Sequence, residues 1–551
     1  MRKLNTLLIF SITFLLPVLI SAQWTNETAV NTLVTESEGG DMKAIATSDG
    51  STFVVFWKTV PGPTNYELRL QRIDNQGVQQ LGPDGILISN EIPMSTFTVI
   101  WSITLDQDDN ILVGVTGTGN ESGHVYKLDA NGNHIWSPAG INVGTGYSLK
   151  MLPLDTYETI VSWLPNGPGL MQKYDENGIA VWPAPKPVES GSGSTVVADM
   201  FEQPFGTYLA VYHSLSFGIS STLYAQRYDG DGNTLWTGPL QISNGTTAFN
   251  REYGGVQDGD IVYYGYFSST ANRFDAYVQR INPDGVIPWG INGTDFDTNE
   301  TDYEMDTRIA FESGSDFVWA ICTYSNTSQG ELGERVQKFD KETGNRFLTD
   351  NAKVVYPISA DHNKHAGDLF LADDRPFFLT SNGFDNGATP TTLSVVLLDE
   401  IGEFFWFEDA FSVATFEASK SRVHLTEPSN GQATTVFIED KGNGNKIYAQ
   451  NFTDVELGGV GVDEITTNIE VSVYPNPTDG PLNILINTEA GTDVWLRVFN
   501  MTSKLISEEQ VYLVPGENQI VIDTEKIQSG LYRFQLLGED LKATGSFTKI
   551  K

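Results

Sequence analysis

Three observations predict an all-β protein, an eight-bladed β-propeller followed by a small Ig-like β-sandwich. A unit with one internal order recurs at a nearly constant spacing along most of the chain. Apolar residues alternate with polar ones or form short runs, and no helical period is sustained beyond the first twenty residues. Glycine and aromatic residues are abundant while charged residues make up only 19% of the chain, which favours short strands and turns.

The composition restricts the class of partner. The 551 residues carry a formal net charge of −37, and so acidic a surface repels phosphates and anionic lipids. We therefore expect neither nucleic acid nor an anionic membrane surface as a partner. The single cysteine, Cys322, lies in an apolar strand-like run, which predicts a buried thiol and not a nucleophile.

The first 22 residues predict a secretory signal peptide. Arg2 and Lys3 precede the apolar run LLIFSITFLLPVLI, and the small residues Ser21 and Ala22 favour cleavage after Ala22. The run is short for a membrane span, and no later segment is long and apolar enough, so we predict no transmembrane segment. No cysteine directly follows the run at the predicted cleavage site, which excludes a lipoprotein.

The repeat is clearest at a turn that follows a strand. Segments such as LYAQRYDGDGNTLW and LMQKYDENGIAVW share an anchor residue, then a glycine, then an aromatic residue. The anchors are Asp74, Asp129, Asp175, Asp229, Asn282, Asp340, Asp399 and Thr453. Each unit contains four strand-like runs, and four-stranded units of this length repeated radially are the blades of a propeller.

The two ends of the array predict a closed ring over residues 23–454. The eighth unit stops after IYAQNF and lacks its last strand, whereas the segment WTNETAVNTLVTE, residues 24–36, supplies the missing piece. Propellers are often locked in this way, by a strand from one terminus that completes the blade at the other. We predict that the strand near residues 28–35 closes the eighth blade.

The character of the chain changes after residue 454. Residues 455–470 are Gly-rich and unpatterned, which predicts a linker. Short alternating runs then follow over residues 471–551, and several such strands in about 80 residues predict a small β-sandwich.

Three segments of this last region resemble a known family. VYPNPTDGPLNI, the later SGLYRFQL and a basic end are similar to the C-terminal sorting domain of the type IX secretion system of Bacteroidetes. The residues that carry the resemblance are Pro475, Asn476, Pro477, Gly480, Gly530, Leu531, Tyr532, Lys549 and Lys551. The resemblance implies export through the periplasm and across the outer membrane by the type IX machinery. The protein is then released or anchored at the cell surface.

The acidic turn DGDGN, residues 229–233, has two interpretations. A calcium loop of the EF-hand type needs a glutamate at its twelfth position, and counting from Asp229 that position is Gln241. The glycine three residues after the anchor is what a hairpin turn with positive φ requires. We therefore predict a turn, which leaves Asp229 and Asp231 as a weak calcium candidate, and we predict no other cofactor.

An aromatic residue lies seven residues after the anchor in six units. These residues are Trp136, Trp182, Trp236, Trp289, Phe347 and Trp406. A large flat side chain at one fixed site per blade is predicted to wedge between neighbouring blades, burying on the order of 200 Å². The alternative is an aromatic platform for sugar rings, which needs only one or two such residues.

The repeated turn also resembles those of two propeller families. KFDKETGNRF resembles the pyrroloquinoline quinone type of repeat, and YDGDGNTLW faintly resembles the Asp-box of sialidases. Quinone dehydrogenases carry a vicinal cysteine pair, which a chain with one cysteine lacks. Sialidases need an arginine cluster and a tyrosine nucleophile, which no positions here match. Both resemblances therefore imply a fold and not an activity.

We expect a secreted or surface-displayed binding or adhesion module whose ligand is an extracellular glycan or protein. The ligand is expected on the top face or in the central channel of the propeller, where loops converge. No catalytic residue is predicted. Two alternatives stay open: an enzyme acting on an extracellular polysaccharide, such as a glycosidase or lyase, and a structural passenger in a surface layer. An enzyme requires carboxylates, or a His, Tyr and Arg group, that converge in one pocket.

Overall fold

The computed structural model describes two stretches of the chain. They are residues 24–453 and 471–550, apart from 62–65, 92–100, 118–121, 166, 189–192, 218–219, 250, 252, 271–272, 361–363, 384–385, 407–408, 489, 501–504, 525–526 and 539–541. The predicted signal peptide, residues 1–22, and the predicted linker, residues 455–470, lie outside the described residues. The chain divides into two compact units, residues 1–459 and 460–551.

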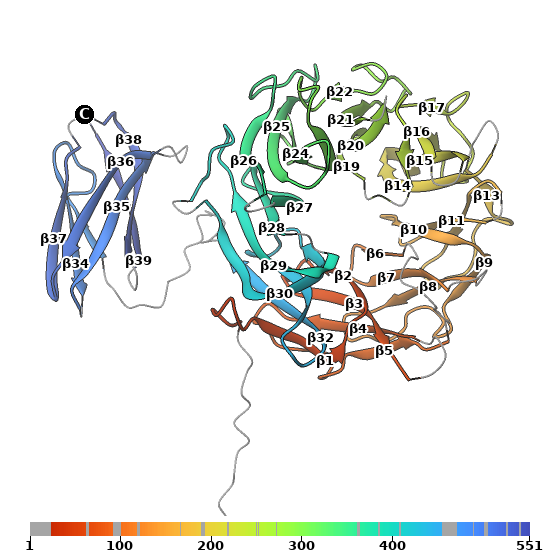
Figure 1. The fold of residues 1–551 in the computed structure, drawn as a ribbon, viewed down its shortest axis with the longest axis horizontal. Coiled ribbons are helices and arrows are strands. Elements are labelled where there is room, and N and C mark those ends of the chain that lie inside the picture. The colour runs from red at the N-terminus through yellow and green to blue at the C-terminus, as the bar shows by residue number, and fades with distance from the viewer. Residues whose placement is uncertain are drawn as a thin grey trace, which may run out of the picture. The chain divides into compact units, whose positions relative to one another are not determined.

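The first unit is a β-propeller whose blades are arranged in a ring (Figure 1). Blade one consists of β2 (Asp41–Ala46), β3 (Thr52–Thr59), β4 (Tyr66–Ile73) and β5 (Ile86–Ser89). Blade two consists of β6 (Ser102–Leu105), β7 (Ile111–Thr116), β8 (Ser122–Leu128) and β9 (Ile141–Thr145). Blade three consists of β10 (Tyr147–Pro153), β11 (Thr159–Leu164), β12 (Leu170–Tyr174) and β13 (Lys186–Pro187). In each of them the four strands pair in chain order and antiparallel, as a blade requires.

Blades four to six follow the same order. Blade four consists of β14 (Thr195–Gln203), β15 (Thr207–Phe217), β16 (Ser220–Tyr228) and β17 (Leu240–Gln241), and the short β18 (Thr247–Ala248) also pairs with β16. Blade five consists of β19 (Gly254–Asp258), β20 (Ile261–Thr270), β21 (Arg273–Ile281) and β22 (Thr294–Asp295). Blade six consists of β23 (Tyr303–Ala310), β24 (Phe317–Ser325), β25 (Leu332–Asp340) and β26 (Lys353–Ser359). A 3-10 turn, Pro204–Gly206, joins β14 to β15.

Blades seven and eight share one strand. Their strands are β27 (Lys364–Ala372), β28 (Arg375–Asn382), β29 (Asn386–Leu397), β30 (Phe411–Leu425), β31 (Gln432–Asp440), β32 (Asn445–Thr453) and β1 (Thr32–Glu38). The first part of β30 pairs with β29 as the outer strand of blade seven, and its last part pairs with β31 as the inner strand of blade eight. The seven strands therefore form one continuous sheet.

The N-terminal strand lies at the outer edge of blade eight. β1 pairs antiparallel with β32, and Thr32 lies opposite Ala449. Val34 in this strand is fully buried in a cluster with Val436 and Ile447 of blade eight. The first and last parts of the propeller thus share one sheet and one apolar cluster.

The apolar core lies between blades and not inside one sheet. One cluster combines Phe53 and Leu70 of blade one with Val113 and Tyr126 of blade two. Because each middle strand is covered by a blade on either side, its residues are buried on both faces. All six residues of β11 are buried, for example. This double burial explains why the middle strands appear as continuous apolar runs and not as alternating ones.

The second unit is a β-sandwich. One sheet contains β33 (Val471–Tyr474), β34 (Leu482–Thr488) and β37 (Gly516–Ile522), and the other contains β36 (Leu505–Leu513), β35 (Thr492–Asn500), β38 (Gly530–Gly538) and β39 (Lys542–Lys549). Side chains such as Ile484, Val494 and Phe534 from both sheets form its buried core. Alternating residues of β34 and β37 point into this core, as expected for sheets with one solvated face.

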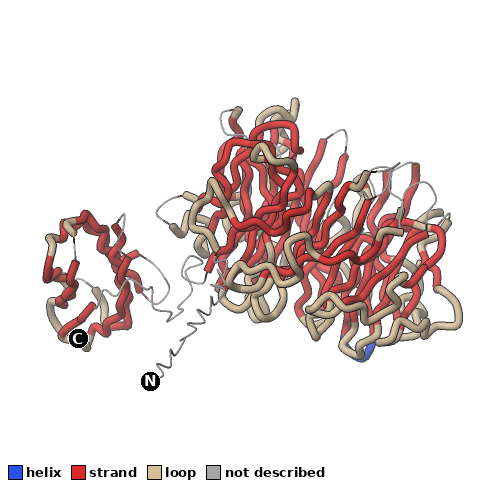
Figure 2. The backbone as a smooth tube through the Cα atoms, turned by 90° about the horizontal axis from the view of Figure 1, so that it is seen from below, coloured by secondary structure: helices blue, strands red, loops and turns tan. Residues whose placement is uncertain are grey.

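The predicted fold class is confirmed, an eight-bladed propeller followed by a small sandwich. Figure 2 shows that the described parts of both units are built of strands and loops, apart from the short 3-10 turn Pro204–Gly206 in the propeller. Among the described residues there is no helix long and apolar enough to span a bilayer.

Candidate functional site

The acidic turn of blade four is held by its own anchor. Asp229 Oδ1 accepts the backbone N–H groups of Asp231 at 2.9 Å and of Asn233 at 2.8 Å, and Oδ2 accepts the Asn233 side-chain amide at 3.0 Å. Gly232 has a φ of 75°, which the hairpin requires. Burial alone would raise the pKa of Asp229, but the hydrogen bonds from Asn233 and Asp231 outweigh it and lower the pKa.

The same arrangement recurs in other blades. Asp129 accepts the N–H groups of Asn131 and Asn133, and Asp175 accepts those of Asn177 and Ile179. In these blades the anchor carboxylate is therefore a turn-forming group of the Asx type. Calcium binding at Asp229 and Asp231 stays a prediction.

In blades two to five, the tryptophan that follows the turn reaches the turn of the next blade. The indole N–H of Trp136 donates to Glu176 O at 3.0 Å, and that of Trp182 donates to Gly230 O at 3.2 Å. Trp236 and Trp289 donate in the same way to Pro283 O and Glu342 O. Each ring also packs on the turn glycine of the next blade. A Cβ added at Gly232, for example, would lie 2.9 Å from the Trp182 ring.

The N-terminal segment supplies this contact for blade eight. The Trp24 indole donates to Asn75 O of blade one at 3.0 Å, and its ring lies 3.0 Å from the position of a Cβ on Gly77. Phe347 differs from the tryptophans, because it is 53% exposed and packs at a tilt of 59° against Phe317 of its own blade. Trp406 packs edge-on against Phe411. The wedge role of all six aromatic residues stays a prediction.

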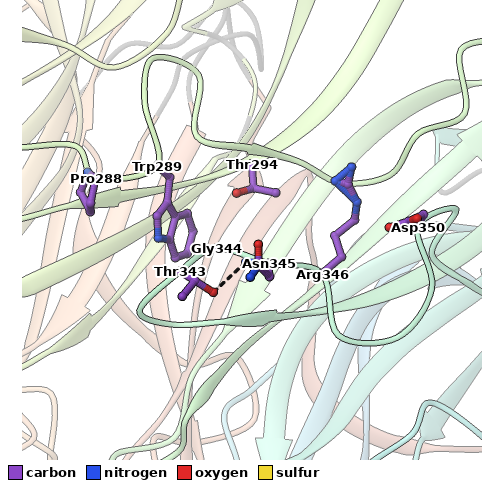
Figure 3. A pocket seen from close by; sticks show the side chains of 8 residues that line it. All are labelled: Pro288, Trp289, Thr294, Thr343, Gly344, Asn345, Arg346 and Asp350. Atoms are coloured by element: carbon purple, nitrogen blue, oxygen red, sulfur yellow. Dashed lines mark hydrogen bonds between the residues drawn. The ribbon is translucent and has the colours of Figure 1, made fainter.

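A hollow of about 520 Å³ opens at the seam between blades five and six (Figure 3). We call it the seam pocket. Its lining residues are Pro288, Trp289, Thr294, Thr343, Gly344, Asn345, Arg346 and Asp350. Pro288 and Trp289 follow the blade-five turn, and Thr294 begins β22. The others come from the turn of blade six and the residues that follow it.

The turn of blade six is the reason for the pocket. Its glycine, Gly344, lies four residues after the anchor Asp340, one more than in the other turns. The Thr343 hydroxyl donates to Asp340 Oδ1 and accepts the N–H of Asn345, a contact that Figure 3 marks. The longer turn presents its polar side chains beside Trp289, which is partly exposed, unlike the buried Trp136 of blade two.

Polar groups in the seam pocket are free to form further hydrogen bonds. Arg346 donates to the carbonyl oxygen of Asp295 at 3.4 Å, while its buried Nε has no hydrogen-bond partner among the described residues. The side chains of Asn345 and Asp350 are exposed at the rim. Asp350 is the one carboxylate among the lining residues.

A smaller hollow of about 90 Å³ lies on the inner strands of blades six to eight. We call it the channel pocket. Arg308, His365, Asp368 and His424 supply its charged and titratable groups. β23, β27 and β30 each contain a register shift at this level, and such bulges redirect side chains. Asp306, at one of these shifts, has a φ of 53°, which is unusual for a residue other than glycine.

Histidine–aspartate contacts connect the residues around the channel pocket. His365 Nε2 lies 3.0 Å from Asp306 Oδ2, and His424 Nδ1 lies 3.7 Å from Asp368 Oδ2. Burial raises the pKa of Asp306, but its hydrogen bond with His365 and the charges of His365 and Arg308 more than compensate. The pKa therefore stays below its usual value, so Asp306 is ionised at neutral pH and is not a general acid.

Carboxyl groups with a raised pKa lie outside both pockets. Burial raises the pKa of Glu334 to about 7 and that of Asp295 to about 7. Neither residue lines the seam pocket or the channel pocket. Among the described residues, Asp295, Asp297 and Glu304 are the group of three acidic side chains that lie close enough together to hold one metal ion.

The predicted sorting residues come together along the last strand. Asn476 Nδ2 donates to Ser546 O at 3.0 Å, and its Oδ1 accepts the N–H of Thr548 at 2.9 Å. Pro475 and Pro477 flank it, each after a cis peptide bond. The other predicted sorting residues lie beside them.

Gly530 pairs with Lys549 across β38 and β39. The Tyr532 hydroxyl donates to Gln528 O at 2.7 Å, and Gly480 O accepts the Thr478 hydroxyl at 2.7 Å. Lys551 and the side chain of Leu531 lie outside the described residues. Residues from three separate segments of the sequence therefore meet at one edge of the sandwich.

Comparison with known families identifies this unit. Residues 472–549 match the family described as secretion system C-terminal sorting domain. The second unit is thus a sorting domain of the type IX secretion system, and the protein is exported to the cell surface or secreted. Its partner during export is the type IX machinery. None of the curated proteins compared with the chain matches it.

Several solved structures show a distant likeness to the chain. A protein of unknown function from Dyadobacter fermentans is 10% identical with a TM-score of 0.37, and 77% of this chain and 97% of that chain are covered. The Dos1 propeller is 11% identical with a TM-score of 0.42, covering 79% and 96%. Penicillium chrysogenum alpha-L-arabinanase, complexed with arabinobiose, is 12% identical with a TM-score of 0.30, covering 56% and 93%. Likenesses at this level carry no argument about function.

Sequence reasoning missed the polar residues of the seam pocket. Asn345 and Arg346 lie in the segment KFDKETGNRF, which indicated only a structural repeat, and Asp350 belongs to no recognised motif. The pocket forms where two blades meet. The available signal was the extra residue between Asp340 and Gly344, which sets this turn apart from the others.

Proposed function

We propose that the protein is a surface or secreted binding module that holds an extracellular glycan in the seam pocket. The observation that carries the proposal is the pocket itself. A partly exposed Trp289 lies beside Arg346, Asn345 and Asp350 in a hollow of about 520 Å³. Binding sites for small ligands are typically hollows of roughly 300–1,000 Å³ with a few fixed polar groups.

The chemistry of the lining favours a glycan over a protein segment. An indole face packs on the C–H face of a sugar ring, while guanidinium, amide and carboxylate groups pair with hydroxyl groups. A specific protein partner typically covers roughly 800 Å² of surface, a larger area than a single hollow of this kind provides. The sugar-platform role considered for the repeated aromatic residues is therefore proposed for Trp289 alone.

Binding is favoured over catalysis by the number and state of the carboxyl groups. Glycosidases generally need two carboxyl groups, one of them protonated, on either side of the scissile bond. The seam pocket has Asp350 alone. The channel pocket keeps an enzyme as the second candidate, because Asp368 and two histidines converge there. Asp306 beside it is held ionised by His365, which argues against a general acid at that position.

A glycan array followed by calorimetric titration tests the proposal. The protein is the mature chain, residues 23–551, and the variant is the double change Asn345→Ala and Asp350→Ala. Both side chains are exposed, and no side-chain hydrogen bond of either is seen among the described residues, so the fold should be preserved. Two lost hydrogen bonds of about 1 kcal/mol each should weaken binding roughly 30-fold.

The matched control is Asp231→Ala, which removes an exposed acidic side chain from the equivalent turn of blade four. It should bind the array glycan like the unchanged protein. If the double variant also binds the glycan unchanged, the seam pocket is not the site. If polymer is cleaved, and His365→Ala abolishes the cleavage, the enzyme candidate replaces the proposal.

A further inference from the structure

A cluster of three carboxylates lies at the seam between blades five and six, away from the turn that was the calcium candidate. Asp295 ends β22, Asp297 follows it, and Glu304 lies in β23 of the next blade. One oxygen from each of the three lies within 4.8 Å of the other two. Two oxygens on one Ca²⁺ ion, each roughly 2.3–2.6 Å from it, are at most about 5 Å apart. The spacing therefore allows all three to bind one ion.

Glu304 gives an independent indication of a ligand. Its side chain is fully buried. Oε2 accepts the backbone N–H of Ala276 at 3.0 Å, whereas Oε1 has no hydrogen-bond partner among the described residues. The nearest cationic group, the Arg273 guanidinium, is 3.7 Å from Oε1, which is too far for a hydrogen bond. A buried carboxylate oxygen in this state is costly, and a cation among the three carboxylates would satisfy it.

The charges around the cluster are not balanced by the protein. The acidic groups are Asp275, Asp295, Asp297, Glu300, Asp302 and Glu304, and the basic groups are Arg273, Arg335 and Arg346. Arg335 is shared between Asp297 at 3.3 Å and Asp302 at 3.6 Å. Arg273 pairs with Asp275 and with Glu300. Six carboxylates thus face three guanidinium groups, an excess that one divalent cation would largely neutralise.

The titration behaviour agrees with this excess. Burial, followed by the charges of neighbouring carboxylates, raises the pKa of Asp295 to about 7. Burial and the charges of Asp297 and Asp295 raise the pKa of Glu304 to about 10. The carboxylates therefore destabilise one another's charged forms, as the excess of negative charge requires.

The order of the residues in the chain also fits an oxygen-rich loop. Asp295, Asp297 and Asn299 occupy alternate positions, as the first acidic residues of calcium loops do. Glu304 is the tenth residue counted from Asp295, not the twelfth as in an EF-hand, and it reaches the cluster from the next blade. We propose that Asp295, Asp297 and Glu304 bind one Ca²⁺ ion that links blade five to blade six, with water or backbone carbonyl groups as further ligands.

Titration of the calcium-free mature chain with calcium chloride, without any glycan, tests the proposal. Calorimetry should show one site per chain, and calcium should raise Tm by several degrees. Mg²⁺ should have a smaller effect, because it tolerates irregular carboxylate sites poorly. Terbium should give sensitised emission, since the Tyr324 hydroxyl donates to Asp297 at 2.6 Å.

Glu304→Gln should weaken calcium binding at least tenfold. Asp295→Asn, at the partly exposed edge of the cluster, should also weaken it at least tenfold, and this variant serves as the test if Glu304→Gln folds poorly. The matched control is Glu334→Gln, since Glu334 is also buried in blade six and has an unpartnered oxygen but lies outside the cluster. Its calcium affinity should equal that of the unchanged protein. The proposal is overturned if the unchanged protein binds no calcium at millimolar concentrations, or if Asp295→Asn binds it normally. It is also overturned if Asp231→Asn is the variant that loses binding.

Discussion

Deleting residues 24–36 from the mature chain tests whether the N-terminal segment closes the ring. The deletion removes the Trp24 contact with the turn of blade one and most of β1. It removes Val34 from the apolar cluster of blade eight. It also removes Asn31, whose side-chain amide donates to Val413 O at 2.8 Å and to Gln450 at 3.2 Å.

The size of the effect follows from these contacts. Burial of Val34, which is fully buried, contributes about 1.5–3 kcal/mol. The partly buried ring of Trp24 and its hydrogen bond contribute about 2 kcal/mol. Val413 O and the Gln450 side chain are buried and lose their hydrogen-bond partners, which costs about 1–3 kcal/mol for each of the two groups. The total is on the order of 8 kcal/mol, which is comparable to the whole stability of many domains.

Thermal unfolding followed by circular dichroism provides the assay. A loss of this size should lower Tm by roughly 10 °C in a unit of this length. The matched pair Val34→Ala and Val30→Ala separates closure from a general effect of changing the segment. Val34 is fully buried and should cost about 2 kcal/mol, whereas Val30 is 52% exposed and should change stability by less than about 0.5 kcal/mol. A deletion variant that melts within about 2 °C of the intact chain would refute the closure.

Three further predictions concern single residues. Trp182→Ala should lower the free energy of unfolding by about 3–5 kcal/mol in urea titrations, because the ring is 4% exposed against the next blade; a loss under about 1 kcal/mol contradicts the wedge role. Gly232→Ala should lower Tm more than Gly238→Ala, because position 232 has a φ of +75° and a Cβ there would lie 2.9 Å from the Trp182 ring. A Cβ at position 238 would have nothing within 4 Å, so equal melting temperatures of the two variants would contradict this packing argument. The pKa of Glu334 is raised by burial to about 7, so the folded state holds a proton that the unfolded state releases above about pH 4.5, and stability should fall as pH rises from 4.5 through 7. Glu334→Gln should flatten that profile in melts from pH 4 to 8, and parallel curves would disprove the assignment.

The blades were predictable because the constraint on each is local and repeated. A glycine three residues after Asp175, Asp229 or Asn282 is required both by positive φ and by the tryptophan ring that packs on it. Such double constraints leave the same spacing in successive units. The missing last strand of the final unit was likewise visible in the sequence, and the structure pairs β1 with β32.

The sites were less predictable because they depend on contacts between blades. The seam pocket requires Trp289 of one blade and Arg346 of the next, and no sequence pattern gives their spatial relation. The carboxylate cluster was missed for a similar reason. Asp295 and Asp297 alternate visibly in the sequence, but the buried Glu304 reaches them only through packing of β23 against blade five. The shared strand β30 was also unpredictable, because one continuous run of 15 residues serves two blades.

The position of Trp24 and β1 has a consequence for the order of folding. The hydrogen bond from Gln450 Nε2 to Thr25 O joins residues 425 positions apart, while contacts between adjacent blades join residues about one repeat apart, such as the 48 positions between Trp182 and Gly230. By loop-closure entropy this roughly ninefold longer separation adds about 2 kcal/mol to the formation of the last contact. Adjacent blades should therefore associate first, and the two ends of the array should meet last. Until they meet, β32 presents an unpaired edge, so a chain caught at that stage is the species most prone to join a strand of a second molecule.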